Sequence, residues 1–268
     1  MKNSVVFGSY VPIDSPIHRL DPRAKLMICF WYVILVFFAN NLWTNLWMAV
    51  FLVGLILMTR VPLVSYWRGI KPMLWIIIFT IAVQILFSSG GHVYWHWGWM
   101  AITSGGIHQC GLIFARFVLI IISSTVLTVT TPPLQLADAV ESIMQPLKFL
   151  HVPVNSIALM LSIALRFIPT IVNEVQQIMN AQRARGANFD SGNVLNRAKR
   201  LVPVLIPLFV SSFKRAEDLA TAMDARGYDP DGKRTKYRVL QWHRRDSIAA
   251  LCMLISTVVL AIIRIEFS

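Results

Sequence analysis

Charged residues are scarce in this sequence, and acidic residues are the scarcest. Only 14% of the 268 residues are charged, with 13 Asp and Glu against 25 Lys and Arg. By contrast, 56% are hydrophobic and the mean hydropathy is +0.60. A soluble domain of this length carries more charge and less apolar sequence. The composition therefore excludes a water-soluble fold and indicates a membrane protein with several spans.

Cysteines are few, and the amino terminus does not resemble a signal peptide. The 3 cysteines, Cys29, Cys110 and Cys252, lie far apart in apolar runs, which argues against a disulfide framework. A signal peptide has an apolar centre and a small-residue cleavage site. The amino-terminal stretch "MKNSVVFGSYVPIDSPIHRLDPRAKL" has neither. We expect this stretch to remain on the mature chain, in the cytoplasm.

Apolar runs of about 20 residues are needed to cross a bilayer, and their positions predict the fold. The predicted spans are Leu26–Ala39, Leu42–Met58, Met73–Phe87, Ile107–Val129 and Ser247–Ile263. We therefore expect an all-α, polytopic integral membrane protein with about five transmembrane helices.

Lys and Arg are absent from two of the segments between these spans, residues 40–46 and 88–106. Basic residues gather on the cytoplasmic side of membrane proteins, so both segments should face outward. The ends predicted to face inward carry Arg19, Arg23, Lys25, Arg60, Arg68, Lys71, Arg244 and Arg245. The chain is thus expected in the cell membrane with its N-terminus inside and its C-terminus outside. The formal charge of +12 is explained by this bias, without a nucleic-acid partner.

More than a hundred residues before the last span do not resemble ordinary spans. Residues 132–150 place apolar side chains at helical spacing and predict an amphipathic helix. Two long helices follow at 153–186 and 193–226, the first interrupted by Pro169 and the second by Pro203 and Pro207.

If both long helices crossed the membrane, basic residues between them would face outward, against the pattern of the rest of the chain. We therefore expect both at the inner interface and in the cytoplasm. The sequence divides into transmembrane helices at 1–131, a cytoplasmic coupling-helix region at 132–232, and a basic segment with the last span at 233–268.

The same tripeptide ends both long helices, as Ala184-Arg185-Gly186 and as Ala225-Arg226-Gly227. Capping alone is one explanation, because Arg complements the helix dipole and Gly adopts the left-handed conformation that closes a helix. Docking is another, because a guanidinium presents five donors in a rigid plane and stays charged. Recurrence on two paired helices favours docking, although capping remains open.

With these two tripeptides, the stretch "LDPRAKL" at 20–26 and this order of helices, the chain resembles the transmembrane T component of energy-coupling factor (ECF) transporters for vitamins and metal ions. The likeness covers essentially the whole chain. It implies a non-catalytic subunit that transmits ATP binding and hydrolysis to uptake of vitamins or similar micronutrients.

The resemblance also implies partners. Two ABC-type ATPase subunits would each accept one long helix, with ATP and Mg²⁺ bound there and no cofactor in this chain. Arg185 and Arg226 would insert at the ATPase surfaces, with Ala184, Gly186, Ala225 and Gly227 allowing close approach. An exchangeable substrate-binding membrane subunit, the S component, would rest on the long helices. Asp21, Pro22 and Arg23 are expected to start the first helix or to form an interface, since Asp at a cap and Pro at the first helical position suffice structurally.

Three other features of the sequence are weaker indications of a functional site. The stretch "GYDPDGKR" at 227–234 resembles a phosphate-binding loop but has Arg where the Mg²⁺-binding hydroxyl belongs. His92 and His96 lack further ligands nearby, so we expect no metal site. Arg116 and Arg166 lie in apolar runs and either serve function, cap a carbonyl or meet a partner.

Two alternatives remain. A basic membrane anchor or scaffold would recruit an unrelated cytoplasmic protein through the same arginines. An integral-membrane enzyme would need a buried polar constellation across several spans, and the predicted spans contain none.

Overall fold

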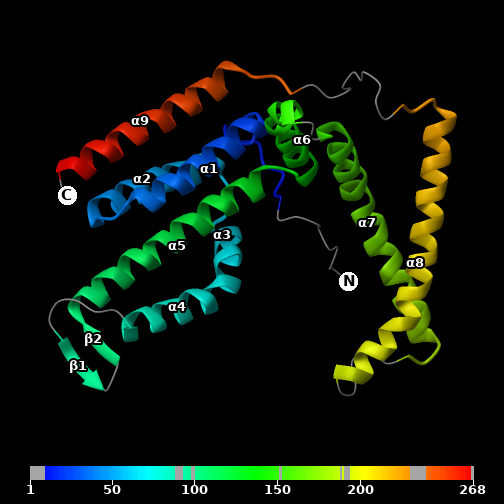
Figure 1. The fold of residues 1–268 in the computed structure, drawn as a ribbon, viewed down its shortest axis with the longest axis horizontal. Coiled ribbons are helices and arrows are strands. Elements are labelled where there is room, and N and C mark those ends of the chain that lie inside the picture. The colour runs from blue at the N-terminus through cyan, green and yellow to red at the C-terminus, as the bar shows by residue number, and fades with distance from the viewer. Residues whose placement is uncertain are drawn as a thin grey trace. The chain divides into compact units, whose positions relative to one another are not determined.

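A computed structural model describes residues 10–87, 93–97, 100–150, 153–187, 189, 194–229 and 240–266. Its helices and strands follow one another as shown in Figure 1. They are α1 (Pro22–Phe38), α2 (Leu42–Thr59), α3 (Leu63–Ile70), η1 (Lys71–Met73), α4 (Leu74–Phe87), β1 (Val93–Trp97), β2 (Met100–Thr103), α5 (Ser104–Thr130), α6 (Pro133–Met144), η2 (Gln145–Leu150), α7 (Val154–Ala184), α8 (Val194–Ala225) and α9 (Arg244–Glu266). Helices dominate, which confirms the predicted all-α class.

Within the described residues, five helical segments are long and apolar enough to cross a membrane, and they confirm the polytopic prediction. They are Leu42–Thr59, Leu63–Leu86, Ser104–Thr130, Val154–Ala184 and Arg244–Glu266. The set differs in two places from the predicted spans. The first predicted span is the 17-residue helix α1, which is slightly shorter than the usual length for a span. Helix α7 has a sufficient length and composition as well, so its place at the interface stays a prediction.

Two elements differ from the sequence prediction. The third span was expected to begin at Met73, whereas the helix already begins at Leu63 as α3 and continues past the 3-10 turn at Lys71–Met73 into α4. Pro72 lies in that turn, where its missing N–H removes a helical hydrogen bond. The segment 88–106, expected to face outward, contains the antiparallel strands β1 and β2, with His96 opposite Ala101. His96 therefore lies on a strand, and His92 lies outside the described residues.

Contacts divide the chain into two units, Met1–Ile143 with Leu240–Ser268, and Met144–Val239. In the first unit α5 contacts α1, α2, α3 and α4, and α9 contacts α1 and α2, as Figure 1 shows for the neighbouring α1, α2, α5 and α9. Tyr32 of α1 is 1% exposed, and its hydroxyl donates to the Met48 carbonyl of α2 at 3.0 Å. This bond satisfies the buried hydroxyl, so the ring stabilises the α1–α2 contact without leaving an unpaired polar group.

The rest of this core is aliphatic. It consists of Leu35, Val36, Ala39, Met48, Leu52, Leu119, Met253 and Leu260. Many other apolar side chains on the same helices are exposed, including Phe30, Val50 and Ile248. Exposed apolar side chains on this scale suit hydrocarbon contact, in agreement with a membrane location.

A segment before α1 is held by polar contacts to buried groups. The His18 ring accepts from the Ser15 hydroxyl at 2.7 Å and donates to the Val11 carbonyl at 3.1 Å. Burial lowers the pKa of His18 below its ordinary value, which keeps the ring neutral for this pair of contacts. The Lys25 ammonium donates to the carbonyls of His18 and Thr130 at 3.2 and 3.0 Å. Lys25 thereby fastens this segment to the carboxyl end of α5, where the helix dipole favours a cation.

Candidate functional site

The two long helices of the second unit end in the same backbone motif. At the end of α7 the Gly186 N–H donates to the Arg183 carbonyl at 2.9 Å. The Ala187 N–H reaches back to the Gln182 carbonyl at 3.0 Å. These two bonds form a Schellman motif, which satisfies carbonyls that the helix leaves without partners. Gly186 has a φ of +89°, in the left-handed region.

The end of α8 repeats this arrangement. The Gly227 N–H donates to the Asp224 carbonyl at 2.9 Å, and the Tyr228 N–H donates to the Met223 carbonyl at 3.0 Å. Gly227 has a φ of +69°. Among the described residues, no atom lies within 4 Å of a Cβ added to Gly186 or Gly227. The backbone conformation, and not a lack of space within this chain, therefore requires glycine at both positions.

Capping explains the glycines and leaves the arginines unexplained. Arg185 and Arg226 are both exposed, as are Ala184 and Ala225, which end the two helices. The Schellman bonds use only backbone atoms. Among the described residues, no hydrogen bond or ion pair joins the guanidinium of Arg185 or Arg226 to another side chain. Each helix thus presents a charged planar group beyond its last turn.

The two helix ends differ in charge. Two residues before Arg185, α7 carries Arg183, whose guanidinium lies 5.9 Å from the centre of the Phe189 ring. The equivalent residue in α8 is the exposed Asp224. The end of α7 is therefore doubly basic, whereas that of α8 combines opposite charges.

An ion pair links α7 to α8 some distance before their ends. The Arg215 Nη2 of α8 lies 3.0 Å from the Glu174 Oε2 of α7, and the guanidinium lies 5.6 Å from the centre of the Phe167 ring. Both charged side chains are more than two thirds buried, at 29% and 20% exposure, so water screens the pair only partly. The contact joins the two helices within the second unit.

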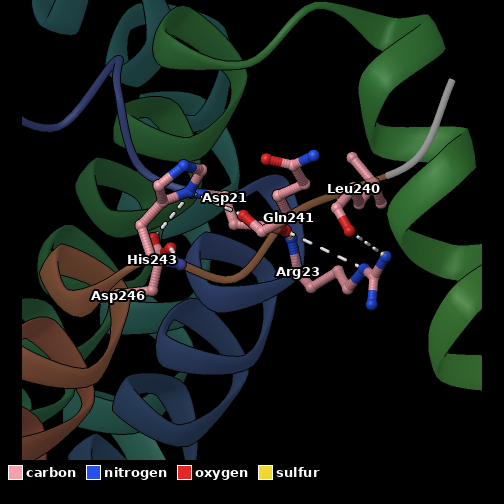
Figure 2. Close-up of polar contacts among 6 residues, drawn as sticks. All are labelled: Asp21, Arg23, Leu240, Gln241, His243 and Asp246. Carbon is pink, nitrogen blue, oxygen red and sulfur yellow. Dashed lines mark hydrogen bonds and ion pairs between the residues drawn. The ribbon is translucent and has the colours of Figure 1, made fainter.

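The residues of the "LDPRAKL" stretch form a joint between α1 and α9, shown in Figure 2. The Asp21 carboxylate caps α1 by accepting from the Arg23 N–H at 2.8 Å, and Pro22 is the first residue of the helix. The buried Asp246 carboxylate accepts from the Asp21 N–H at 2.7 Å and from the His243 N–H at 2.8 Å. One carboxylate therefore ties the amino ends of two helices together.

The remaining arginine of this joint fastens the chain before α9. The Arg23 Nη2 donates to the Leu240 carbonyl at 3.2 Å, and Figure 2 shows its side chain extending toward that carbonyl. The Arg23 Nε lies 3.9 Å from the Asp21 Oδ1. Asp21, Pro22 and Arg23 thus have structural contacts within this chain.

Other residues singled out from the sequence are dispersed. Pro169 lies inside α7, and Pro203 and Pro207 lie inside α8, all three exposed. The Arg116 Nη2 donates to the Ala39 carbonyl at the end of α1 at 3.4 Å, which agrees with the carbonyl-capping alternative. Arg166 is exposed on α7.

Nucleotide and metal sites gain no support from the geometry. Of the phosphate-loop-like stretch 227–234, residues 230–234 lie outside the described part of the chain. Within the described part, no group of three or more His, Cys, Asp or Glu side chains is arranged to hold a metal ion.

Comparison with known proteins places the chain in a family. The model of the family described as "Cobalt transport protein" (CbiQ) matches residues 14–237. A protein of Limosilactobacillus fermentum named "Energy-coupling factor transporter transmembrane protein EcfT" is 61% identical, over 99% of both chains. A Lacticaseibacillus paracasei protein of the same name is 51% identical, over 98% of this chain and 99% of its own. A Listeria monocytogenes protein, named EcfT 1, is 50% identical over the same shares.

The chain belongs to the T-component family of ECF transporters. This membership confirms the resemblance inferred from the paired tripeptides and the order of helices. The T component is a multi-pass membrane component of a transporter, and the apolar helices described above agree with that location. The integral-membrane enzyme considered from the sequence has no support from the family.

Sequence reasoning missed several residues that organise this T component. Glu174 and Arg215 form an ion pair although they lie 41 positions apart in the sequence, and no local pattern marks such a pair. Asp246 had a local signal, because an acidic residue at the third position of a helix often reaches back to the cap. Its second partner, Asp21, is 225 positions away and only the tertiary structure reveals it.

Proposed function

We propose that this T component is the coupling subunit of an ATP-driven importer. It transmits ATP binding and hydrolysis in two ABC-type ATPase subunits to a substrate-binding S component, for uptake of vitamins or similar micronutrients. ATP and Mg²⁺ bind to the ATPases, and this chain hydrolyses nothing. The observation that carries the proposal is the pair of capped helix ends, each with an exposed guanidinium that the cap does not use.

The proposed contact is insertion of Arg185 into one ATPase and of Arg226 into the other. A guanidinium binds carboxylates and backbone carbonyls through several donors at fixed angles, which suits a groove on a partner. Ala184 and Ala225 have small side chains, and Gly186 and Gly227 have none, so a partner surface can approach both helix ends closely. The membrane orientation follows from this function, with the helix ends and the N-terminus in the cytoplasm and the C-terminus outside.

The S component has a candidate contact on α8. The side chains of Ile206, Phe209, Val210 and Phe213 are exposed and border an open groove with a volume of about 730 Å³. A partner embedded in the same membrane can cover these apolar side chains. The description of the family names cobalt, whereas the names of the relatives give no substrate. The choice of substrate is assigned to the S component.

The test separates docking from capping. As a cap, Arg contributes about 0.3–1 kcal/mol through the helix dipole, and Lys replaces it with little loss. As a docking group it needs the planar fork, so Arg185→Lys and Arg226→Lys should each reduce uptake. The double variant with Ala at both positions should remain a stable membrane protein that retains the ATPases poorly and drives no uptake. ATP-dependent uptake into vesicles and ATPase retention on the purified complex are measured at matched expression.

Arg68→Lys is the control, because Arg68 is an exposed arginine on α3, a helix other than the two that end in the tripeptide. It should leave uptake and ATPase retention unchanged. Wild-type uptake by the double Ala variant would refute the docking function. Retention of an unrelated cytoplasmic protein in place of ATPases would favour the scaffold alternative.

A further inference from the structure

The first unit contains an apolar cavity among α1, α2, α5 and α9 that the coupling function does not use. Its volume is about 580 Å³, within the range of about 300–1,000 Å³ typical of ligand pockets. Its lining is almost entirely apolar and includes Ile28, Tyr32, Trp47, Phe51, Leu55 and Val126. From Trp47 to Met58 it follows α2 for about 16 Å, at 1.5 Å per residue. A long, narrow apolar ligand fits these dimensions.

The cavity is open along its α2 and α9 sides. Three lining residues are more than half exposed, namely Val50 at 58%, Met58 at 51% and Ile248 at 60%. Gly54 lies on the same wall, and a Cβ added there would meet no atom within 4 Å. These residues belong to helices with the composition of membrane spans, so the opening faces hydrocarbon. A ligand can enter sideways from the bilayer.

One end of the cavity is basic. Lys25 and Arg245 line it there, beside the amino ends of α1 and α9. The carboxylates of Asp21 and Asp246 and the carboxyl end of α5 offset the charge of Lys25, so the uncompensated positive charge is that of Arg245. Lys25 already donates to two carbonyls. Arg245 is exposed, and no hydrogen bond or ion pair is found between its side chain and any other residue in the described part of the chain.

We infer that this cavity is a binding site for an anionic phospholipid. One acyl chain occupies the apolar cavity, and the phosphate contacts Arg245. The lipid comes from the leaflet that faces the amino ends of α1 and α9. A zwitterionic lipid would fill the same apolar volume without a matching net charge, so selectivity for net negative charge identifies the site. The inference needs only a membrane location and is independent of the proposed coupling function.

The experiment is native mass spectrometry of the full-length chain from micelles with equal amounts of palmitoyl-oleoyl phosphatidylglycerol and phosphatidylcholine. The wild-type chain should retain one phosphatidylglycerol in preference to phosphatidylcholine. Arg245→Gln should lower that preference about fivefold, the factor for one basic residue near an anionic surface. Arg244→Gln is the matched control, because Arg244 precedes it in the same turn and does not line the cavity. It should keep the preference.

A second pair of variants tests the apolar volume. Gly54→Leu should obstruct part of the cavity and lower retention of either lipid. Gly111→Leu should retain phosphatidylglycerol, because Gly111 of α5 also has free space around an added Cβ but does not line the cavity. A measurement on the native sequence complements these variants. Phosphatidylglycerol should slow the reaction of Cys252, which lines the cavity, with an apolar maleimide and leave Cys110 unaffected.

Three results would each overturn the inference. They are equal retention of the two lipids by the wild-type chain, undiminished preference in Arg245→Gln, and equal retention of phosphatidylglycerol by Gly54→Leu and Gly111→Leu. An unchanged rate at Cys252 would also contradict it.

Discussion

Gly186 and Gly227 perform a different task from the arginines that precede them. Each glycine adopts a positive φ and closes a helix through backbone hydrogen bonds, whereas each arginine side chain is exposed and takes no part in the cap. The repeated tripeptide therefore combines a folding signal with an interaction group. The two tasks can be separated by substitution.

Gly186→Ala should loosen the end of α7 while leaving Arg185 in place. A left-handed conformation costs a residue with a Cβ about 1–2 kcal/mol, so the Schellman bonds should open roughly tenfold more often. Hydrogen exchange of peptides covering residues 182–187 measures this opening. Gly111→Ala, in the interior of α5, is the control and should not change exchange at the end of α7. Unchanged exchange in Gly186→Ala would contradict the requirement for glycine.

Asp246 shows at the scale of elements how two helices distant in sequence are joined. Its carboxylate is 1% exposed and accepts two backbone N–H groups, one before α1 and one before α9. Hydrogen bonds to charged groups contribute about 1.5–3 kcal/mol each. Asp246→Asn keeps the shape but loses one acceptor, so it should lower the free energy of unfolding by about 1.5–3 kcal/mol. The loss is measured as a lower denaturant midpoint of the purified chain.

Asp218→Asn is the comparison for Asp246→Asn, because Asp218 is exposed on α8. It should leave the midpoint within experimental error. An equal effect of the two substitutions would mean that the joint contributes nothing particular to stability.

The ion pair between Glu174 and Arg215 fixes how α7 and α8 pack. Removal of one partner should lower uptake although both helix ends stay intact, because the partly buried partner is left unpaired. Pairs in direct contact show coupling energies of about 0.5–3 kcal/mol in double-mutant cycles. Glu174→Arg and Arg215→Glu should each impair uptake, and their combination should restore part of it. Absence of any restoration would indicate that the pair does not set the register.

The helices were more predictable from the sequence than their contacts. The helices predicted at 153–186 and 193–226 agree with α7 and α8 to within one residue, except at the end of α7, which differs by two. Prolines, apolar stripes and glycine caps mark these helices locally. The extent of α3 and the β1–β2 hairpin were missed, since the first is set by packing against α5 and the second by pairing between strands. The joint at Asp246 and the lipid cavity depend on residues from distant helices, which hydropathy does not relate.

At the scale of the whole molecule, charge and hydropathy lead to different predictions for the location of α7. Its length and composition suffice for a span. The distribution of Lys and Arg instead favours an inner location for the residues that follow it. If α7 alone crossed, every later segment would change sides, including the end of α9. The side of α9 is therefore linked to the location of α7.

Two single cysteines, placed in a chain with its three native cysteines replaced, decide between these arrangements. With α7 at the inner interface, Ala187→Cys should react with an impermeant thiol reagent only after the membrane is opened, and Glu266→Cys should react in intact cells. If α7 alone crossed, the accessibility of the two positions would be reversed. If α7 and α8 both crossed, both cysteines would react from outside. Only the first outcome places the two arginines on the same side as the ATPases, because positions 187 and 185 share the end of one helix.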